Sequence, residues 1–130
     1  MNLRSAFAVA FIASIATPAL AAEHSCKVER KFDSERQYTA EQIDRSEFSN
    51  RLEEIGSRSY LSRCSFASSA GKVTCDRYEV DRVEFDQTAK IKKFYVFRSQ
   101  FDFQLFSDLS FVENNGRGGI SYGKCTLTSP

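Results

Sequence analysis

The four cysteines have the clearest chemistry in this sequence, because their spacing separates thiol chemistry from disulfide bonding. They are Cys26, Cys64, Cys75 and Cys125. The long gap between Cys64 and Cys75 is unlike the Cys-x-x-Cys spacing of redox-active or zinc-binding pairs. An even number of cysteines in a short exported chain indicates a disulfide framework instead. We therefore expect no reactive thiolate.

Acid–base chemistry has little support in the sequence. The only histidine, His24, lies close to the predicted mature N-terminus, where we expect a solvated side chain that holds no catalytic geometry. Six acidic residues could supply a glycosidase pair, but lysines and arginines alternate with them as on a solvated surface: Glu53, Glu54, Asp81, Glu84, Asp86 and Glu113. The sequence predicts no catalytic residue, no metal site and no cofactor, hence no enzyme. A carboxylate-dependent glycan hydrolase remains the second alternative function.

Two groups of residues are candidates for binding. The first is the loop carrying Asn114, Asn115 and Arg117, which either serves only as a permissive hairpin turn or presents Arg117 as a forked donor for an anion. The second is an aromatic-rich segment, where Lys92, Lys93 and Tyr95 are neighbours of several phenylalanines. Aromatic residues on both faces of a strand favour an exposed patch or an internal cavity. The first alternative function is therefore a β-barrel carrier of a lipid or another apolar ligand.

Residues 1–22 are typical of a secretory signal peptide. Arg4 precedes an apolar stretch too short to span a bilayer, and small residues lead to expected cleavage after Ala21 or Ala22. Glu23, not a cysteine, follows, which argues against a lipid anchor. We expect a single domain over residues 23–130, without a membrane anchor, in the periplasm or outside the cell.

The charge balance limits the classes of partner. The chain has 18 basic and 17 acidic residues, and Arg4 is the only charged residue of the expected signal peptide. The mature domain therefore carries equal numbers of both signs. Such a surface exerts no long-range attraction on nucleic acid or anionic lipid, and we exclude nucleic acid as a partner.

Alternation of apolar and polar residues predicts an antiparallel sheet in the C-terminal half. Segment 101–111 alternates throughout, which predicts one long strand. Segments 91–97 and 120–127 flank it, so the three would form a meander.

A hairpin upstream predicts the disulfide pairing. If the turn between segments 60–66 and 73–80 centres on Ser69 and Ala70, Cys64 lies directly opposite Cys75. This leaves Cys26 to pair with Cys125. Along the second arm the apolar parity changes from Val73 and Cys75 to Tyr78 and Val80, and then to Val83 and Phe85. Each change predicts a bulge or bend, and hence a kinked strand.

The N-terminal part contains a plausible strand from Cys26 and an ambiguous segment, 39–55. Thr39 and Gln42 could form a capping box, whereas Phe48 and Leu52 fit either a helix or a strand. We favour a helical turn near 40–44 and a strand over 47–55. The predicted fold is all-β: a small antiparallel meander of about seven or eight strands curled into a barrel or sandwich, with one short helix and two disulfides.

These features favour an exported, non-enzymatic binding module that acts by surface recognition in the cell envelope. The expected architecture is similar in fold class and location to small periplasmic lysozyme inhibitors, which are disulfide-linked antiparallel barrels. Their motifs Ser-Gly-x-x-Tyr and Tyr-x-x-x-Thr-Lys-Gly are absent here, so no residue roles are transferred. The expected partner is an envelope protein or an incoming hydrolase, and the sequence leaves the oligomeric state undefined.

Overall fold

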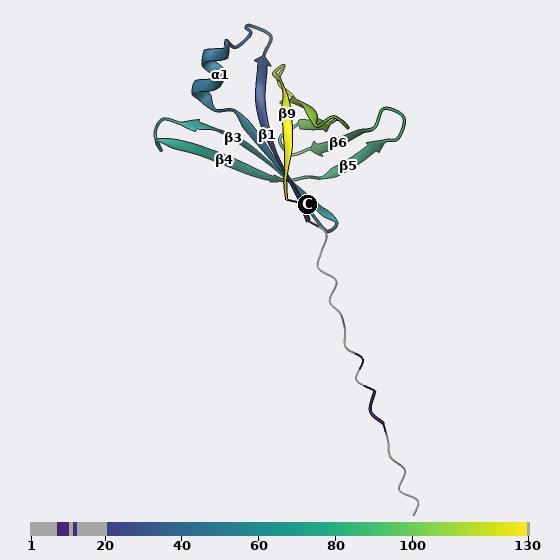
Figure 1. Cartoon of the computed structure of the whole chain (residues 1–130). Coiled ribbons are helices and arrows are strands. Elements are labelled where there is room, and N and C mark those ends of the chain that lie inside the picture. The colour runs from purple at the N-terminus through teal and green to yellow at the C-terminus, as the bar shows by residue number, and fades with distance from the viewer. Residues whose placement is uncertain (1–7, 11, 13–20, 130) are drawn as a thin grey trace, which may run out of the picture.

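The computed structural model describes residues 8–10, 12 and 21–129, and nine strands and one helix form the folded part (Figure 1). The strands are β1 (Ala21–Phe32), β2 (Ser49–Ile55), β3 (Arg58–Ala67), β4 (Lys72–Glu79), β5 (Arg82–Asp86), β6 (Ile91–Val96), β7 (Phe101–Leu105), β8 (Ser110–Asn114) and β9 (Ile120–Ser129). The helix α1 (Ala40–Ser46) connects β1 to β2. The predicted all-β class with one short helix is confirmed.

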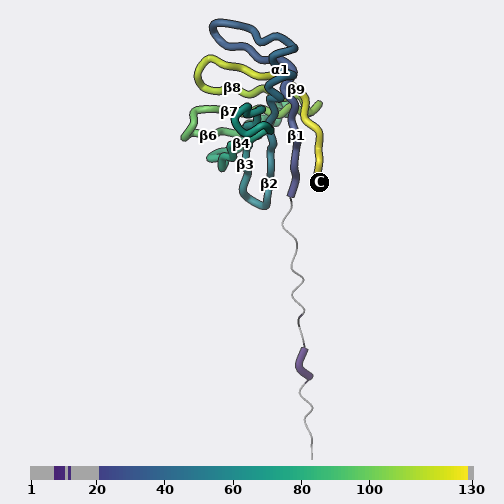
Figure 2. The backbone as a smooth tube through the Cα atoms, turned by 90° about the vertical axis from the view of Figure 1, so that its left-hand side faces the viewer, coloured from purple at the N-terminus to yellow at the C-terminus, as the bar shows by residue number. Residues whose placement is uncertain are grey.

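All strands belong to one antiparallel sheet in the order β4-β3-β2-β1-β9-β8-β7-β6-β5. Strands β1 and β9 pair in its middle and lie side by side in Figure 2. The sheet curls into a half-barrel, and hairpins β3–β4 and β5–β6 extend to opposite sides of it (Figure 1). Strands β4 and β5 are the two edges, so the half-barrel is open between them.

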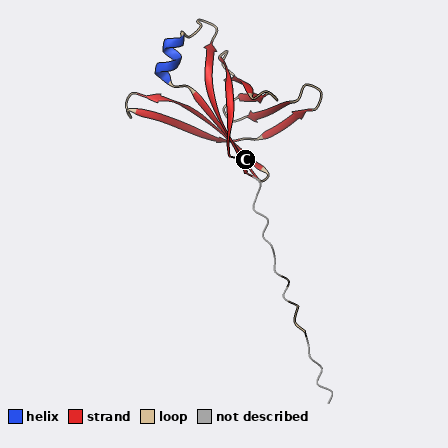
Figure 3. Ribbon diagram, viewed as in Figure 1, coloured by secondary structure: helices blue, strands red, loops and turns tan. Residues whose placement is uncertain are grey.

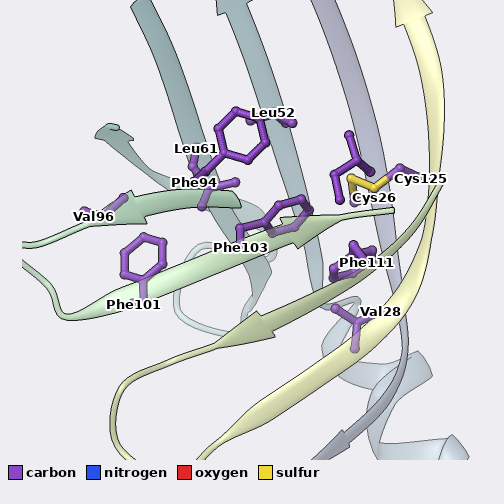
Figure 4. Close-up of a cluster of buried hydrophobic side chains, with 11 residues drawn as sticks. Cys26, Val28, Leu52, Leu61, Phe94, Val96, Phe101, Phe103, Phe111 and Cys125 are labelled. Atoms are coloured by element: carbon purple, nitrogen blue, oxygen red, sulfur yellow. A yellow bond between two sulfur atoms is a disulfide. The ribbon is translucent and has the colours of Figure 1, made fainter. Parts of the chain in front are cut away.

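The concave face of the sheet holds the apolar core (Figure 4). The largest side chains with almost no exposed surface are Phe94, Phe103, Phe111, Leu52 and Leu61. The rings of Phe103 and Phe111 stack with centroids 5.0 Å apart. Gly123 makes room for this packing, because a Cβ atom there would lie 2.7 Å from the Phe111 ring and 1.8 Å from a β1 carbonyl oxygen.

Both predicted disulfides are confirmed. Cys26 of β1 pairs with Cys125 of β9 inside the core, and Cys64 pairs with Cys75 across hairpin β3–β4. Each bond joins residues that the strand register already places directly opposite. In the chain-entropy account the Cys26–Cys125 bond, which encloses nearly the whole domain, stabilises the fold by roughly 4 to 5 kcal/mol.

The ambiguous segment after residue 39 contains a helix followed by a strand, as favoured from the sequence. Thr39 and Gln42 form the capping box, in which each side chain accepts from the other residue's backbone N–H. Glu47 ends the helix with a left-handed φ of 48°. Helix α1 then lies at one end of the curled sheet (Figure 3), and we call this the helix end.

The predicted single strand over 101–111 is wrong. Strand β7 ends at Leu105, and a turn leads into β8 at Ser110. No glycine or proline marks this turn; instead, Leu109 adopts a φ of 68°, and the Asp108 carboxylate accepts hydrogen bonds from the N–H and hydroxyl of Ser110. The apolar alternation continues through the turn, which is why the sequence suggested one strand and too few strands overall.

The predicted single kinked strand is also wrong: β4 pairs with β3 without a register shift, and the chain bends at Asp81 before a separate strand, β5. The chain leaves β4 at Glu79 and starts β5 at Arg82, on the opposite edge of the sheet. The two connecting residues pair with both halves of the sheet: the Val80 N–H donates to Ser59 and the Asp81 N–H to Tyr95, each at 2.9 Å. The parity change in the sequence therefore marks the point where the chain crosses from edge strand β4 to edge strand β5.

The expected signal peptide lies outside the described residues, apart from residues 8–10, 12 and the two alanines that begin β1. Among the described residues, no helix has the length and apolar character needed to cross a membrane.

Candidate functional site

An open cleft of about 170 Å³ lies on the concave face at the helix end of the half-barrel. Strands β1, β2, β3, β4, β8 and β9 all contribute side chains to it. The polar and charged ones are Lys31, Ser49, Asn50, Arg63, Ser65, Asp76, Glu113 and Ser121. The cleft therefore joins segments from both halves of the sheet, and most of its lining is polar.

A buried carboxylate forms the centre of this cleft. The Glu113 side chain is 5% exposed, and its Oε1 lies 2.8 Å from Nε of Arg63 in an ion pair. The other carboxylate oxygen accepts from the amide nitrogen of Asn50, which is itself buried. Both oxygens are thus engaged by groups from the other half of the sheet. This pairing offsets the cost of removing a charge from water.

Strand register explains how these residues meet. Asn50 of β2 lies opposite Arg63 of β3, which in turn lies opposite Asp76 of β4. Directly paired residues share a face of the sheet, so the three side chains form one row across the concave face. Glu113 follows Phe111 with the same parity on β8 and reaches the row from across the curl.

A second cation lies at the rim of the cleft. Nζ of Lys31 donates to the Ser121 hydroxyl at 3.2 Å and lies 5.0 Å from the centroid of the Phe48 ring. Tyr38 packs edge-on against Phe48 with centroids 5.9 Å apart, and its ring also faces the ammonium. The cleft thus combines two cations, two carboxylates and an aromatic wall, a combination suited to a polar group.

The opposite end of the concave face carries a different cluster. Lys92 of β6 forms an ion pair with Glu54 of β2, and Leu52 separates this pair from Asn50 along β2. His24 of β1 lies nearby, and its Nδ1 is buried without a hydrogen-bond partner among the described residues. Burial lowers the pKa of His24, an effect that Glu54 opposes and Lys92 reinforces.

The expectation of a solvated His24 is therefore wrong. The residue lies within β1, between Leu52 of β2 and Leu127 of β9, because β1 forms the middle of the sheet and not a frayed end.

The predicted loop residues hold the turn between β8 and β9. The Asn114 side chain accepts from the N–H of Gly116, and the Asn115 side chain accepts from those of Arg117 and Gly119. Gly116 has a φ of 72°, and a Cβ there would lie 1.8 Å from the Gln100 carbonyl oxygen. The asparagines thus have structural partners, while the Arg117 side chain is exposed.

The predicted β6 residues lie on two faces. Lys92 points into the curl toward Glu54, whereas Lys93 and Tyr95 have the opposite parity and lie on the convex face. The Tyr95 hydroxyl donates to Glu84 at 3.2 Å; burial, and then this hydrogen bond, raise the pKa of Tyr95. The structure therefore does not bring the six predicted binding residues into one site.

Sequence reasoning missed the cleft. Asn50 and Glu113 each occupy the inward parity of a strand next to a core residue, Leu52 and Phe111 respectively. A polar residue at an apolar position of the alternation was the available signal, since such residues are rarely buried without a partner. The curl of the sheet, which brings β8 close to β2 and β3, could not be predicted from the sequence.

No three His, Cys, Asp or Glu side chains within residues 8–10, 12 and 21–129 are grouped so that they could hold a metal ion. Comparison with protein-family models, with curated proteins and with solved structures gives no match for this chain.

Proposed function

We propose that this protein is a non-enzymatic binding domain of the periplasm or the extracellular space, which recognises a protein partner through the cleft at the helix end. The partner would be an envelope protein or a hydrolase that reaches the envelope. Two disulfides support an oxidising compartment, where such bonds persist. They also support a rigid scaffold, which lowers the entropic cost of binding.

The observation that carries this proposal is the buried Glu113 carboxylate beside an open cleft. A buried ion pair contributes little net stability compared with apolar residues of the same volume. Here it is placed at the mouth of an otherwise apolar core, and it orients Arg63 and Asn50 beside the cleft. Arg63 is itself partly exposed and lines the cleft, so its guanidinium, a forked donor, is placed where a partner's acceptor can reach it.

The same geometry argues against the two alternative functions. A two-acid hydrolase needs carboxylates free to serve the substrate, but both Glu113 oxygens are engaged and Arg63 lies between it and Asp76. A carrier needs an empty apolar interior, but the concave face is filled by phenylalanines and leucines with almost no exposed surface.

The test blocks the cleft without disturbing the ion pair. Ser65 lines the cleft, and Ser65→Tyr would place a ring in it. Ser68→Tyr adds the same ring to the exposed β3–β4 turn and serves as the matched control. The mature protein and both variants are immobilised and exposed to envelope extracts, and captured proteins are quantified by mass spectrometry.

We expect a specific protein to be captured by the wild type and by Ser68→Tyr, and to be reduced at least tenfold with Ser65→Tyr at an unchanged melting temperature. Equal capture by all three proteins would refute the cleft as the binding site. Release of a glycan or a lipid from the wild type, with no captured protein, would favour an alternative function.

A further inference from the structure

Strand β4 forms one edge of the sheet, and its backbone groups point alternately toward β3 and toward the opening. The Cα atoms of Cys64 and Cys75 are 4.1 Å apart, the short separation of a non-hydrogen-bonded pair. The Val80 N–H, of opposite parity, donates to Ser59. The N–H and C=O groups of the odd-numbered residues of β4, namely Val73, Cys75, Arg77 and Glu79, therefore point away from β3. This array can hydrogen-bond with a further strand.

On the concave face, a row of polar and charged side chains runs across the sheet and ends at strand β4. The row Asn50, Arg63, Asp76 ends at the edge, with Arg63 already paired to Glu113. Asp76 is exposed and borders the cleft. A residue added opposite Asp76 would form a non-hydrogen-bonded pair, the arrangement in which cross-strand side chains lie closest. A cation is the complementary partner at this position.

The next position along the edge is apolar. Leu52, Leu61 and Tyr78 form the neighbouring row, and the Tyr78 ring packs edge-on against Phe101 with centroids 5.0 Å apart. A second hollow of about 180 Å³ lies beside Tyr78 and Glu79. Successive inward side chains of an added strand would thus meet Tyr78 beside this hollow and then Asp76 at the cleft.

We propose that the partner presents an extended segment that adds to the β4 edge as an antiparallel strand, with an apolar residue opposite Tyr78 and a lysine or arginine opposite Asp76. This inference rests on the proposed function and specifies the partner's chemistry at the same cleft. Main-chain hydrogen bonds supply affinity, and the apolar-x-basic pattern supplies specificity. The strand lengthens the curl toward the opening between β4 and β5.

A second copy of this chain satisfies only part of this pattern. In an antiparallel pair of β4 strands that uses the outward backbone groups, a two-fold axis at Asp76 or at Arg77 places like charges directly opposite each other, which is destabilising. An axis at Thr74 places Lys72 opposite Asp76, but Tyr78 then faces Ala70, which lies in the turn before β4. A heterologous segment can satisfy the charged and the apolar position together.

The first test uses synthetic probes. Three blocked peptides of about nine residues alternate threonine and valine and differ at one central inward position, which is lysine, glutamine or glutamate. Binding to the mature protein is followed by amide hydrogen exchange. With the lysine peptide we expect slower exchange at Val73, Cys75 and Arg77 and no change at Thr74, Asp76 and Tyr78. Absence of this two-residue periodicity, or no binding of any peptide at millimolar concentration, overturns the inference.

Two variants test the backbone contact. Val73→Pro removes an N–H that the fold does not use, and proline is tolerated at such edge positions. Val73→Thr changes the same side chain and keeps the N–H. We expect Val73→Pro to weaken binding of the lysine peptide about tenfold, since it removes a hydrogen bond and obstructs the register, and Val73→Thr to bind as the wild type. Equal loss in both variants overturns the backbone contact.

Charge reversal tests the side-chain contact. We expect the wild type to prefer lysine to glutamate peptide by about fivefold, the effect of one cross-strand ion pair, and Asp76→Lys to reverse this preference. An unchanged preference, or a dimer whose outward β4 amides are already protected without peptide, overturns the inference. If Ser65→Tyr abolishes capture of the partner but Val73→Pro does not, the cleft function stands and strand addition fails.

Discussion

An ion pair crosses the concave face at each end of the half-barrel, and the two pairs differ in how deeply they are buried. At each end, an acidic and a basic residue from opposite halves of the sheet form an ion pair across the concave face. The Glu113 and Arg63 side chains are 5% and 31% exposed at the helix end. Those of Glu54 and Lys92 are 23% and 35% exposed at the other end.

The surroundings of the two ion pairs also differ. At the helix end, Asn50 donates a hydrogen bond to the buried carboxylate in addition to the ion pair, and an open cleft borders the pair. At the other end, the pair is more hydrated and lies near an imidazole with an unpartnered buried nitrogen. Buried pairs fix geometry, whereas exposed pairs contribute little. The helix end is the one for which we propose recognition, and for the other end we expect a modest stabilisation that depends on pH and salt.

The largest expected effect is on the buried pair. Arg63→Met leaves Glu113 with a buried charge that only Asn50 compensates, and should reduce the free energy of unfolding by roughly 3 kcal/mol. This value is the lower end of the range for such changes because Arg63 is partly exposed. The midpoint of urea denaturation measures the loss.

A double variant distinguishes charge burial from lost packing. Arg63→Met combined with Glu113→Gln removes both charges while the glutamine keeps a contact with Asn50. We expect most of the stability to return. A double variant as unstable as Arg63→Met would mean that the guanidinium acts through its packing over the Phe101 ring, 5.0 Å away, and not through the charge.

The comparison also shows which parts of the molecule follow from sequence. Local pairing was predictable: the β3–β4 register, the Cys64–Cys75 disulfide and the Thr39 capping box depend on short spacings and turn chemistry. The Cys26–Cys125 disulfide then followed by elimination. The turn before Ser110 was not, because its residues continue the apolar alternation. Both ion pairs were also missed, since each joins strands that are distant in the sheet order and meet only through the curl.

A smaller effect is expected at the other end, where the pair is only partly buried. Lys92→Met breaks the pair with Glu54 and should reduce the free energy of unfolding by about 0.5 to 1 kcal/mol at low salt. The loss should diminish as salt is added, because exposed charges are screened over about 10 Å at 0.1 M ionic strength. Urea denaturation at two salt concentrations measures both quantities. A loss as large as that of Arg63→Met would remove the distinction between the two ends.

The smallest effect is the pH dependence that His24 gives to the end that carries Lys92 and Glu54. Burial lowers its pKa in the folded state below the unfolded value of about 6.5. The unfolded chain therefore binds the proton more readily. The stability linked to this group is complete above about pH 6.5 and is lost as the pH falls through the folded pKa. We expect wild type to lose more stability than His24→Gln between about pH 7.5 and about pH 5.

The charges around the imidazole determine how strongly the free energy of unfolding depends on pH through His24. Glu54 opposes the lowering of the pKa and Lys92 reinforces it. Lys92→Met should therefore bring the folded pKa closer to the unfolded one and flatten the pH dependence, although it also breaks the ion pair. Arg63→Met, at the helix end, should leave the shape of the pH profile unchanged while it lowers the whole curve. If Arg63→Met changed this shape as much as Lys92→Met does, the two ends would be coupled through the core, and one could not be assigned to recognition independently of the other.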